Sequence, residues 1–515
     1  MATETKNLAL GLYQSISNAH IEGRLDSVLR RQRELYSLHV AVKRHAKTLA
    51  DAIQHDTGSH TDALVEIHTT LHRLREIFKC LDFPSSLEHE YLPEYGKDVP
   101  SRRSGLGAIL VLPGDTLPVS QTILPIAYCL AAGNPVLAVL SEKHPATTSA
   151  MLTMFETSAI DRDVVALCGQ PSDTEQEMLL NELKDCPFDG VWEQGASGAN
   201  FWDGGSNAPV HHSRQQVIGG ASGVFPCIVS RNADLQRAAK DIALANLVAL
   251  SGQSPAAANV ILVDEFVLEA FCAAVRALAA QLTHAWQRDK ATQPAQKFLD
   301  TQVEFVDAGG RLLQVDGGAI LVASSEWRSR SHFENCISSM TMGSLTPTPV
   351  VPIFPVTSME AAMSLACNIM PAHRISGWYI YASDAEARYI TSALPAHPTF
   401  VNGIPYLNLW APVPSLPPAL MLDFLSKPCP ISMNTSRSGI TGDFLFNAPH
   451  ERVGSALETL IDGEMLEPPK QRSGAQVGFF EQGGRVGLAH LLVVLGASLA
   501  SSWWAWSSFA RKGLD

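Results

Sequence analysis

The sequence predicts an α/β protein with two parallel-sheet domains and a C-terminal transmembrane helix. Short apolar runs alternate with helical patterns between residues 105 and 400, which is typical of parallel sheets covered by helices. Apolar residues make up 46% and charged residues 17% of the 515 residues, as expected for a globular core. Residues 486–510 contain no Asp, Glu, Lys or Arg.

The first ninety residues are predicted to be helical. Apolar side chains recur close to a 3.6-residue period, for example at Leu64, Ile67, Leu71 and Leu74. His68 and His72 are four residues apart on such a helix and could bind a metal. Because no third ligand is evident, we expect a solvated helix surface there and no metal site.

The first α/β pattern begins near residue 105. The strands are predicted at 107–112, 135–140 and 188–192, with a helix at 119–132. No GxGxxG follows any of them, so the usual dinucleotide fingerprint is absent. A second pattern follows, with strands at 228–229, 260–263, 320–323, 350–354 and 378–381 and helices at 234–250 and 266–282.

Charge and cysteine content exclude several function classes. The net charge of −13 disfavours nucleic acid as a partner, because phosphate contacts need clustered Lys and Arg. Nine cysteines without CxxC spacing form neither a disulfide scaffold nor a zinc motif. The first residues contain no long apolar stretch, so we expect no secretory signal.

The apolar stretch at residues 486–510 is predicted to be a membrane anchor. As a helix it would be about 37 Å long, enough to cross a hydrocarbon layer of about 30 Å. Arg485 precedes it, Arg511 and Lys512 follow it, and Trp503 and Trp504 lie near one end, where aromatic rings favour the interface. We expect a lipid bilayer as partner and a single-pass anchor that leaves the bulk of the chain cytosolic. The sequence does not identify the organelle whose membrane is bound. The alternative is a buried C-terminal helix.

Several motifs resemble those of the aldehyde dehydrogenase superfamily, most closely its class 3 and fatty aldehyde dehydrogenase branch. The resemblance covers residues 25–432. Ala131-Ala132-Gly133-Asn134 with Ser141-Glu142 is similar to the helix-to-strand run that leads to the nucleotide ribose. The other similar stretches are Phe188-Asp189 with Gly195, the segment 226–235, Ser251-Gly252-Gln253 and the segment 376–384.

The resemblance implies a domain order and a reaction. Residues 1–215 would form the N-terminal helices and nucleotide-binding-like domain, 216–412 the catalytic-like domain, and 413–450 an oligomerisation-like segment that allows a homodimer. Residues 451–485 would be a linker to the anchor. The family oxidises an aldehyde to an acid with NAD or NADP, using a Cys thiolate, a Glu base and two oxyanion donors.

The sequence departs from the family at each catalytic position. Pro255 stands where the nucleophile is expected, and proline has neither a thiol nor a backbone N–H. Thr116 occupies the position of the family's Asn, whose side chain donates to the oxyanion. The base falls on Val217 or on Gly220, depending on the alignment, and neither has a carboxylate. Ser254 and Glu193 are the candidates that could replace a nucleophile and a base, although we expect Glu193 to lie at the surface.

Cofactor contacts are reduced as well. Val139 occupies the position of the family's Lys, and Leu345 occupies the position of the Glu that binds the nicotinamide ribose. Glu142 and Gly195 match the family. Binding of NAD or NADP is therefore expected to be weak or absent. Two alternatives follow. The chain is a membrane-anchored family member without standard activity, a pseudoenzyme, or it is an active NAD(P)-dependent oxidoreductase with altered chemistry on a lipophilic small molecule.

Overall fold

We analysed a computed structural model of the 515-residue chain. The structure describes residues 2–91, 105–141, 143–169, 173–193, 216–218, 224–285, 310–315, 318–323, 349–369, 375–394, 398–411, 431–433 and 454. The chain divides into two compact units, residues 1–81 with 104–466 and residues 82–103 with 467–515. In the smaller unit the described part is helix α5 (Phe83–Tyr91).

The larger unit contains a five-stranded parallel sheet with the order β3-β2-β1-β4-β5. Its central strand pairs on both sides, with Ile109 opposite Val136 on β2 and opposite Gly190 on β4. The strands are β1 (Ile109–Leu112), β2 (Val136–Val139), β3 (Val165–Cys168), β4 (Gly190–Glu193) and β5 (Gln216–Ile218).

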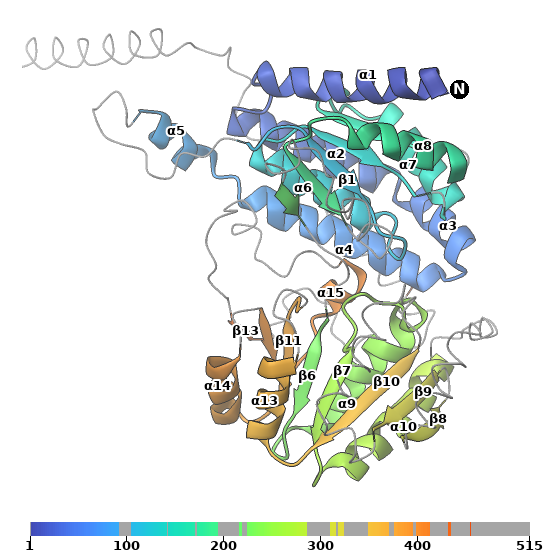
Figure 1. Ribbon diagram of the computed structural model, residues 1–515, viewed down its shortest axis with the longest axis vertical. Coiled ribbons are helices and arrows are strands. Elements are labelled where there is room, and N and C mark those ends of the chain that lie inside the picture. Colours follow the sequence, from blue (N-terminus) through green and yellow to red (C-terminus); the bar gives the residue numbers. More distant parts are fainter. Residues whose placement is uncertain are drawn as a thin grey trace, which may run out of the picture. The chain divides into compact units, whose positions relative to one another are not determined.

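Helices cover both faces of this sheet, which explains why its central strands are apolar throughout. On β1, Ile109 and Val111 face one apolar cluster and Leu110 faces another. The second cluster contains residues of α1 (Ala2–Ile21) and α8 (Asp173–Lys184), and the first contains residues of α6 (Ser120–Ala132) and α7 (Pro145–Glu156). Figure 1 shows these helices around β1.

Three N-terminal helices contribute to the same apolar cluster as α6 and α7. They are α2 (Val28–Arg44), α3 (Ala46–Thr57) and α4 (His60–Lys79). The Ser59 side chain caps α4 by accepting a hydrogen bond from the N–H of Asp62. Helix α4 packs on α2, α3 and α6, so one side of it is buried along most of its length.

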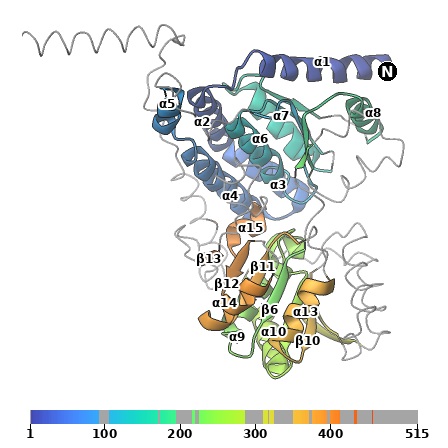
Figure 2. The same ribbon diagram turned by 60° about the vertical axis from the view of Figure 1, so that its left-hand side comes forward.

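The second sheet has eight strands in the order β13-β12-β11-β6-β7-β10-β9-β8, of which only β8 runs antiparallel to its neighbour. Short α15 (Tyr406–Trp410) follows β12 and lies beside α4 (Figure 2). The strands are β6 (Pro226–Val229), β7 (Val260–Asp264), β8 (Arg311–Val315), β9 (Gly318–Val322), β10 (Val350–Val356), β11 (Trp378–Tyr381), β12 (Thr399–Val401) and β13 (Ile431–Met433).

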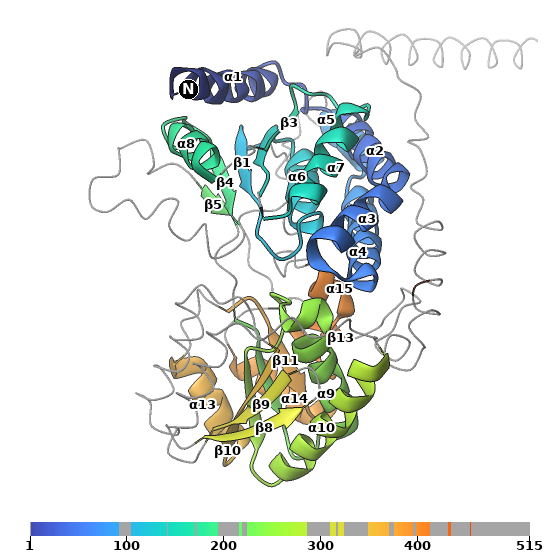
Figure 3. The same ribbon diagram turned by 90° about the vertical axis from the view of Figure 1, so that its right-hand side faces the viewer.

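Helices also cover both faces of the second sheet. The face formed by Cys227, Val229 and Ile261 packs on α9 (Leu235–Ala243) and α10 (Leu268–Ala285). The opposite face, which includes Ile228, packs on α13 (Met359–Ile369) and α14 (Asp384–Ala393). Figure 3 shows α13 and α10 on opposite sides of the sheet.

The structure confirms the predicted strands, and most of their ends shift by one to three residues. Five strands at or next to the sheet edges were not predicted: β3 and β8 are partly exposed, and β5, β12 and β13 have only three residues each. The helix predicted at 234–250 is wrong beyond Ala243, where the chain continues as a π-helical turn, Leu244–Val248, and a 3₁₀ turn, Ala249–Gly252.

The predicted membrane anchor at residues 486–510 lies outside the described residues. Among the helices that the structure does describe, none combines the length and apolar character needed to cross a bilayer.

Candidate functional site

The order of the first sheet changes direction between β1 and β4. From β1 the chain adds β2 and β3 on one side and then β4 and β5 on the other. In open parallel sheets, ligands bind at such a switch point, beside the carboxyl ends of the strands. Glu193 ends β4 directly opposite Leu112 of β1, and Thr116 lies in the turn that follows β1. Two of the sequence-predicted positions therefore belong to this edge.

The turn after β1 carries an acidic side chain that sequence reasoning did not single out. One carboxylate oxygen of Asp115 accepts a hydrogen bond from the Ser141 hydroxyl at 3.0 Å, and the other pairs with the Lys143 ammonium at 2.5 Å. The hydroxyl of Thr116 accepts from the Gln121 amide at 3.4 Å. The Asp115–Lys143 pair thus bridges the segments that follow β1 and β2.

The predicted nucleophile position lies in a loop that begins with strained backbone. Leu250 and Ser251 adopt left-handed conformations with φ of 49° and 60°, and Gly252 follows with φ of 77°. Left-handed backbone in non-glycine residues costs about 1–3 kcal/mol each and is concentrated at functional sites. Pro255 follows three residues later and is half-buried.

Beyond Gly252, hydrogen bonds to other parts of the fold hold the loop in place. Ser254 is fully buried, and its hydroxyl donates to the carbonyl of Leu409 on α15 at 2.9 Å. The Tyr379 hydroxyl donates to the carbonyl of Ala256, also at 2.9 Å. The Asn246 amide donates to the Ala258 carbonyl at 2.8 Å and its oxygen accepts from the Ala258 N–H. The Ser254 proton is therefore held by a carbonyl, which cannot serve as a base.

Two buried carboxylates on α4 hold the segments around this loop. Asp62 accepts from the indole N–H of Trp410 at 2.9 Å and from the N–H of Leu250 at 3.3 Å. Glu66, one turn later, accepts from the N–H groups of Val119 and Ser120 at the start of α6, at 2.9 and 2.8 Å. One helix thus fixes both the strained turn and the helix that follows Thr116.

The environment of Glu66 favours its neutral form. Its side chain is fully buried, and this burial, with a smaller contribution from the charge of Asp62, raises its pKa to about 8 despite the two backbone hydrogen bonds. Sequence reasoning missed this pair. The available signal was two acids four residues apart within an apolar helical stretch, a spacing that puts both on one buried face.

Of the remaining predicted site residues, Glu193 and Val217 lie on described strands. Glu193 is buried, with 6% of its surface exposed, although a surface position was expected for it. The reason is that it still belongs to the sheet interior as the last residue of β4. Val217 lies on β5, and its side chain is outside the described part. Gly220, Glu142 and Gly195 also lie outside the described residues.

Two described thiols of the second sheet's layer are held in their neutral form by burial. Cys227 lies on β6 and is fully buried, and this burial raises its pKa well above the usual thiol value. Burial likewise raises the pKa of Cys272 to about 11. Because the thiolate is the attacking species, both groups remain unreactive thiols at neutral pH.

The predicted solvated surface at the two α4 histidines is wrong for His68, which is fully buried and stacks on His72 with ring centroids 6.3 Å apart. The burial follows from the packing of α4 against its neighbouring helices. His72 pairs with Glu76 at 3.5 Å. In the described ranges, no group of three or more His, Cys, Asp or Glu residues could hold a metal ion.

The switch point of the first sheet is the edge at which a dinucleotide would lie. A pyrophosphate needs donors at this edge, such as backbone N–H groups or a cation. The described side chains there include two acids, Asp115 and Glu193, and the one cation at Asp115 is the Lys143 that already neutralises it. Among the described residues of this edge, the two acids therefore offer a pyrophosphate no donor.

Comparison with known proteins identifies the family. The model described as the aldehyde dehydrogenase family matches residues 19–332, more than half of the chain. A candidate aldehyde dehydrogenase of Staphylococcus haemolyticus is 25% identical over 308 residues, which are 58% of this chain and 61% of that protein. The chain thus spans less than two thirds of that relative. AldX of Bacillus subtilis, also a candidate aldehyde dehydrogenase, is 24% identical over 332 residues, 62% of this chain and 71% of AldX.

Solved structures share the fold. A salicylaldehyde dehydrogenase from Pseudomonas putida G7 superposes with a TM-score of 0.60 at 15% identity, covering 77% of this chain and 82% of that one. An NADP-dependent glyceraldehyde-3-phosphate dehydrogenase from Bacillus halodurans, complexed with NADP, gives 0.57 at 16% identity, covering 78% and 83%. By sequence match and by fold, the chain belongs to the aldehyde dehydrogenase family.

Proposed function

We propose that this chain is an aldehyde dehydrogenase family protein that has lost the covalent mechanism and acts at a membrane, where it binds or regulates without oxidising an aldehyde. The observation that carries the proposal is the loop at Pro255. Proline supplies neither the thiolate nor the N–H of an oxyanion hole, and the adjacent Ser254 is tied to a backbone carbonyl. The loss of one oxyanion donor alone costs about 10²–10³ in rate.

The loss of nucleotide binding is the second part of this proposal. The acids at the switch point and the Asp115–Lys143 pair oppose a pyrophosphate, so we expect NAD and NADP to bind weakly or not at all. Residual affinity would come from Glu142 and Gly195, the two positions that match the family in sequence.

Calorimetric titration of the full-length chain with NAD and with NADP tests both parts. We expect no saturable heat at micromolar protein, and no decanal-dependent rise in absorbance of the reduced nucleotide. The Pro255→Cys variant should remain inactive, because the base position has no carboxylate. Robust turnover by that single variant would show that a base is present and would contradict the proposal.

An active oxidoreductase with altered chemistry is the second candidate. The observation that favours it is the strain at Leu250 and Ser251, which Asp62 holds in place beside the predicted nucleophile position. Strain of this kind persists where the surroundings enforce it, and such places are often active sites. Saturable binding of NAD or NADP together with aldehyde-dependent reduction would select this candidate.

The membrane anchor is tested by fractionation. Deletion of residues 486–515 should move the protein from the membrane to the soluble fraction, because it removes the apolar stretch and its flanking cations. Deletion of residues 467–485, which precede the stretch, is the matched control and should leave the protein in the membrane. Full-length protein that is soluble without detergent would contradict the anchor.

A further inference from the structure

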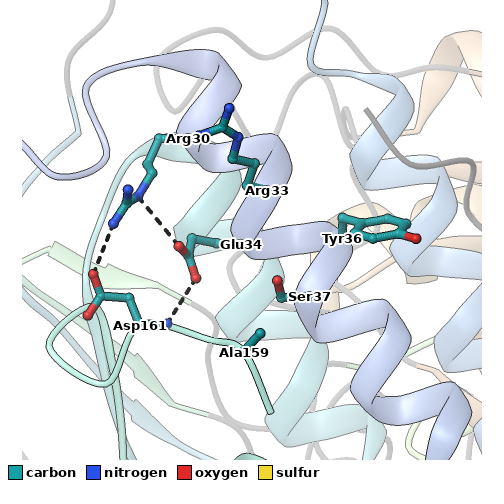
Figure 4. Close-up of a pocket in the computed structure, with 7 residues that line it drawn as sticks. All are labelled: Arg30, Arg33, Glu34, Tyr36, Ser37, Ala159 and Asp161. Carbon is teal, nitrogen blue, oxygen red and sulfur yellow. Dashed lines mark hydrogen bonds and ion pairs between the residues drawn. The ribbon is translucent and has the colours of Figure 1, made fainter. Parts of the chain in front are cut away.

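A surface pocket on helix α2 is separate from the segments discussed so far. It has a volume of about 450 Å³ and lies between α2 and the turn that leads into β3. Figure 4 shows Arg30, Glu34 and Asp161 at one end, Tyr36 at the other, and Ser37 with Ala159 between them. Arg33 completes the lining. Pockets of about this size bind small molecules.

The acidic side chains of the pocket are already engaged. The Arg30 guanidinium lies 3.2 Å from the Asp161 carboxylate and 3.6 Å from one oxygen of Glu34. The other Glu34 oxygen accepts from the Asp161 N–H at 3.1 Å. Arg24 donates to Asp161 as well, at 3.2 Å. Both carboxylates are therefore paired with cations from the protein itself.

The other polar side chains of the pocket are uncommitted. Arg33 makes no ion pair or hydrogen bond with any residue in the described part of the chain, and the hydroxyls of Tyr36 and Ser37 make none there either. The three residues are spaced i, i+3 and i+4 on α2, which places them on neighbouring positions of one helix face. The unused groups are a guanidinium and two hydroxyls, all able to donate.

We propose that this pocket binds a small phosphorylated ligand, with its phosphate held by Arg33 and Ser37 and its organic part lying against Tyr36. A guanidinium offers parallel N–H donors that match phosphate oxygens, and a hydroxyl adds a further donor. Arg30 is not part of the phosphate site, because its guanidinium already pairs with Glu34 and Asp161. The remaining volume accommodates the organic part of a phosphate monoester. The site is independent of the chemistry at Pro255.

The alternative is an arginine that is solvated at the surface without a function. Arg44, at the end of the same helix, has that character, because it is exposed and does not line the pocket. It provides a matched control. A site built from Arg33 responds to Arg33→Ala and not to Arg44→Ala, whereas general attraction of anions responds to both changes alike.

Isothermal titration of the full-length chain with inorganic phosphate and with dihexanoyl phosphatidic acid tests the proposal. We expect saturable binding of at least one probe at one site, weakened about tenfold or more by Arg33→Ala and unchanged by Arg44→Ala. Tyr36→Phe combined with Ser37→Ala should weaken it too, and this variant keeps all charges. Tighter binding of the lipid would identify a headgroup as the source of the phosphate, and tighter binding of inorganic phosphate a soluble ligand.

Two results would overturn the site. One is the absence of binding of either probe to the wild-type chain. The other is equal binding by the wild-type chain, Arg33→Ala and the Tyr36→Phe, Ser37→Ala variant, each with an unchanged melting temperature. Equal weakening by Arg33→Ala and Arg44→Ala would also reject the pocket, because it would indicate attraction to the whole helix.

Discussion

Replacement of Glu66 by Gln should remove a pH dependence from the stability of this protein. Glu66 is fully buried on α4, where its carboxyl accepts hydrogen bonds from Val119 and Ser120. Burial raises its pKa from 4.5 to about 8. The Gln side chain has nearly the same shape, keeps the accepting oxygen and mimics the neutral carboxylic acid.

The sign and size follow from proton binding. Between pH 4.5 and about 8, the folded chain keeps a proton on Glu66 that the unfolded chain has lost, so stability falls as pH rises. The contribution is fully present below pH 4.5 and lost by pH 8. At about 1.4 kcal/mol per unit, the whole window corresponds to about 5 kcal/mol, and the part from pH 6.5 to 8 to about 2 kcal/mol.

Urea unfolding of the full-length chain, followed by tryptophan fluorescence, measures this effect. Glu66 should lower the free energy of unfolding of the wild type by about 2 kcal/mol between pH 6.5 and 8, and Glu66→Gln should lack this contribution over the same interval. Asp241→Asn is the matched control. Burial raises the pKa of Asp241 to about 6, so this change should alter the slope mainly below pH 6.5.

Equal slopes for the wild type and Glu66→Gln between pH 6.5 and 8 would refute the reasoning. They would mean that Glu66 is ionised in the folded protein across this range, stabilised by the start of α6. The two carboxylates of α4 would then both carry charge, and the expected preference for one neutral acid would be wrong.

Four further substitutions, at three positions, give separate expectations. Gly252→Ala should cost on the order of 2 kcal/mol or more, because a Cβ there would lie 2.5 Å from Pro349 Cα in a residue with φ of 77°. Gly58→Ala, with φ of 80° and open space around it, should cost only about 1 kcal/mol. Equal melting temperatures of the Gly252→Ala and Gly58→Ala variants would contradict the clash predicted at Gly252. Asp234→Ala should cost about 1 kcal/mol by removing the cap of α9, Asp234→Asn should cost less, and an unchanged urea midpoint for the Ala variant would contradict this.

Much of the fold could be predicted from local patterns. Buried parallel strands are apolar on both faces, so β1, β2, β7 and β11 stand out as short apolar runs between helical stretches. The missed strands lie at or near sheet edges, where the pattern is shorter or mixed with exposed residues. The break in the helix after Ala243 was also missed, because the cause is distant: Asn246 bonds to Ala258 and Val350.

The candidate site was predictable where residue type alone decides the chemistry. Proline cannot attack a carbonyl in any environment, so the prediction for position 255 needs no coordinates. The fate of Ser254 depended on its partner, the carbonyl of Leu409, which is 155 residues away in sequence. The acids Asp62 and Glu66 were missed for the same reason, since their partners lie on α6, α15 and the strained turn.

The sequence by itself therefore determined the alternation of strands and helices and the family, and it predicts that the matched catalytic positions lack a thiol and a carboxylate. These properties depend on local periodicity and on the chemistry of single side chains. Only the tertiary structure decided which polar groups are neutral, which are already bonded, and which, like Arg33, have no partner in the described part of the chain. The protonation and hydrogen bonding of a group depend on the neighbours that folding brings to it from distant parts of the chain.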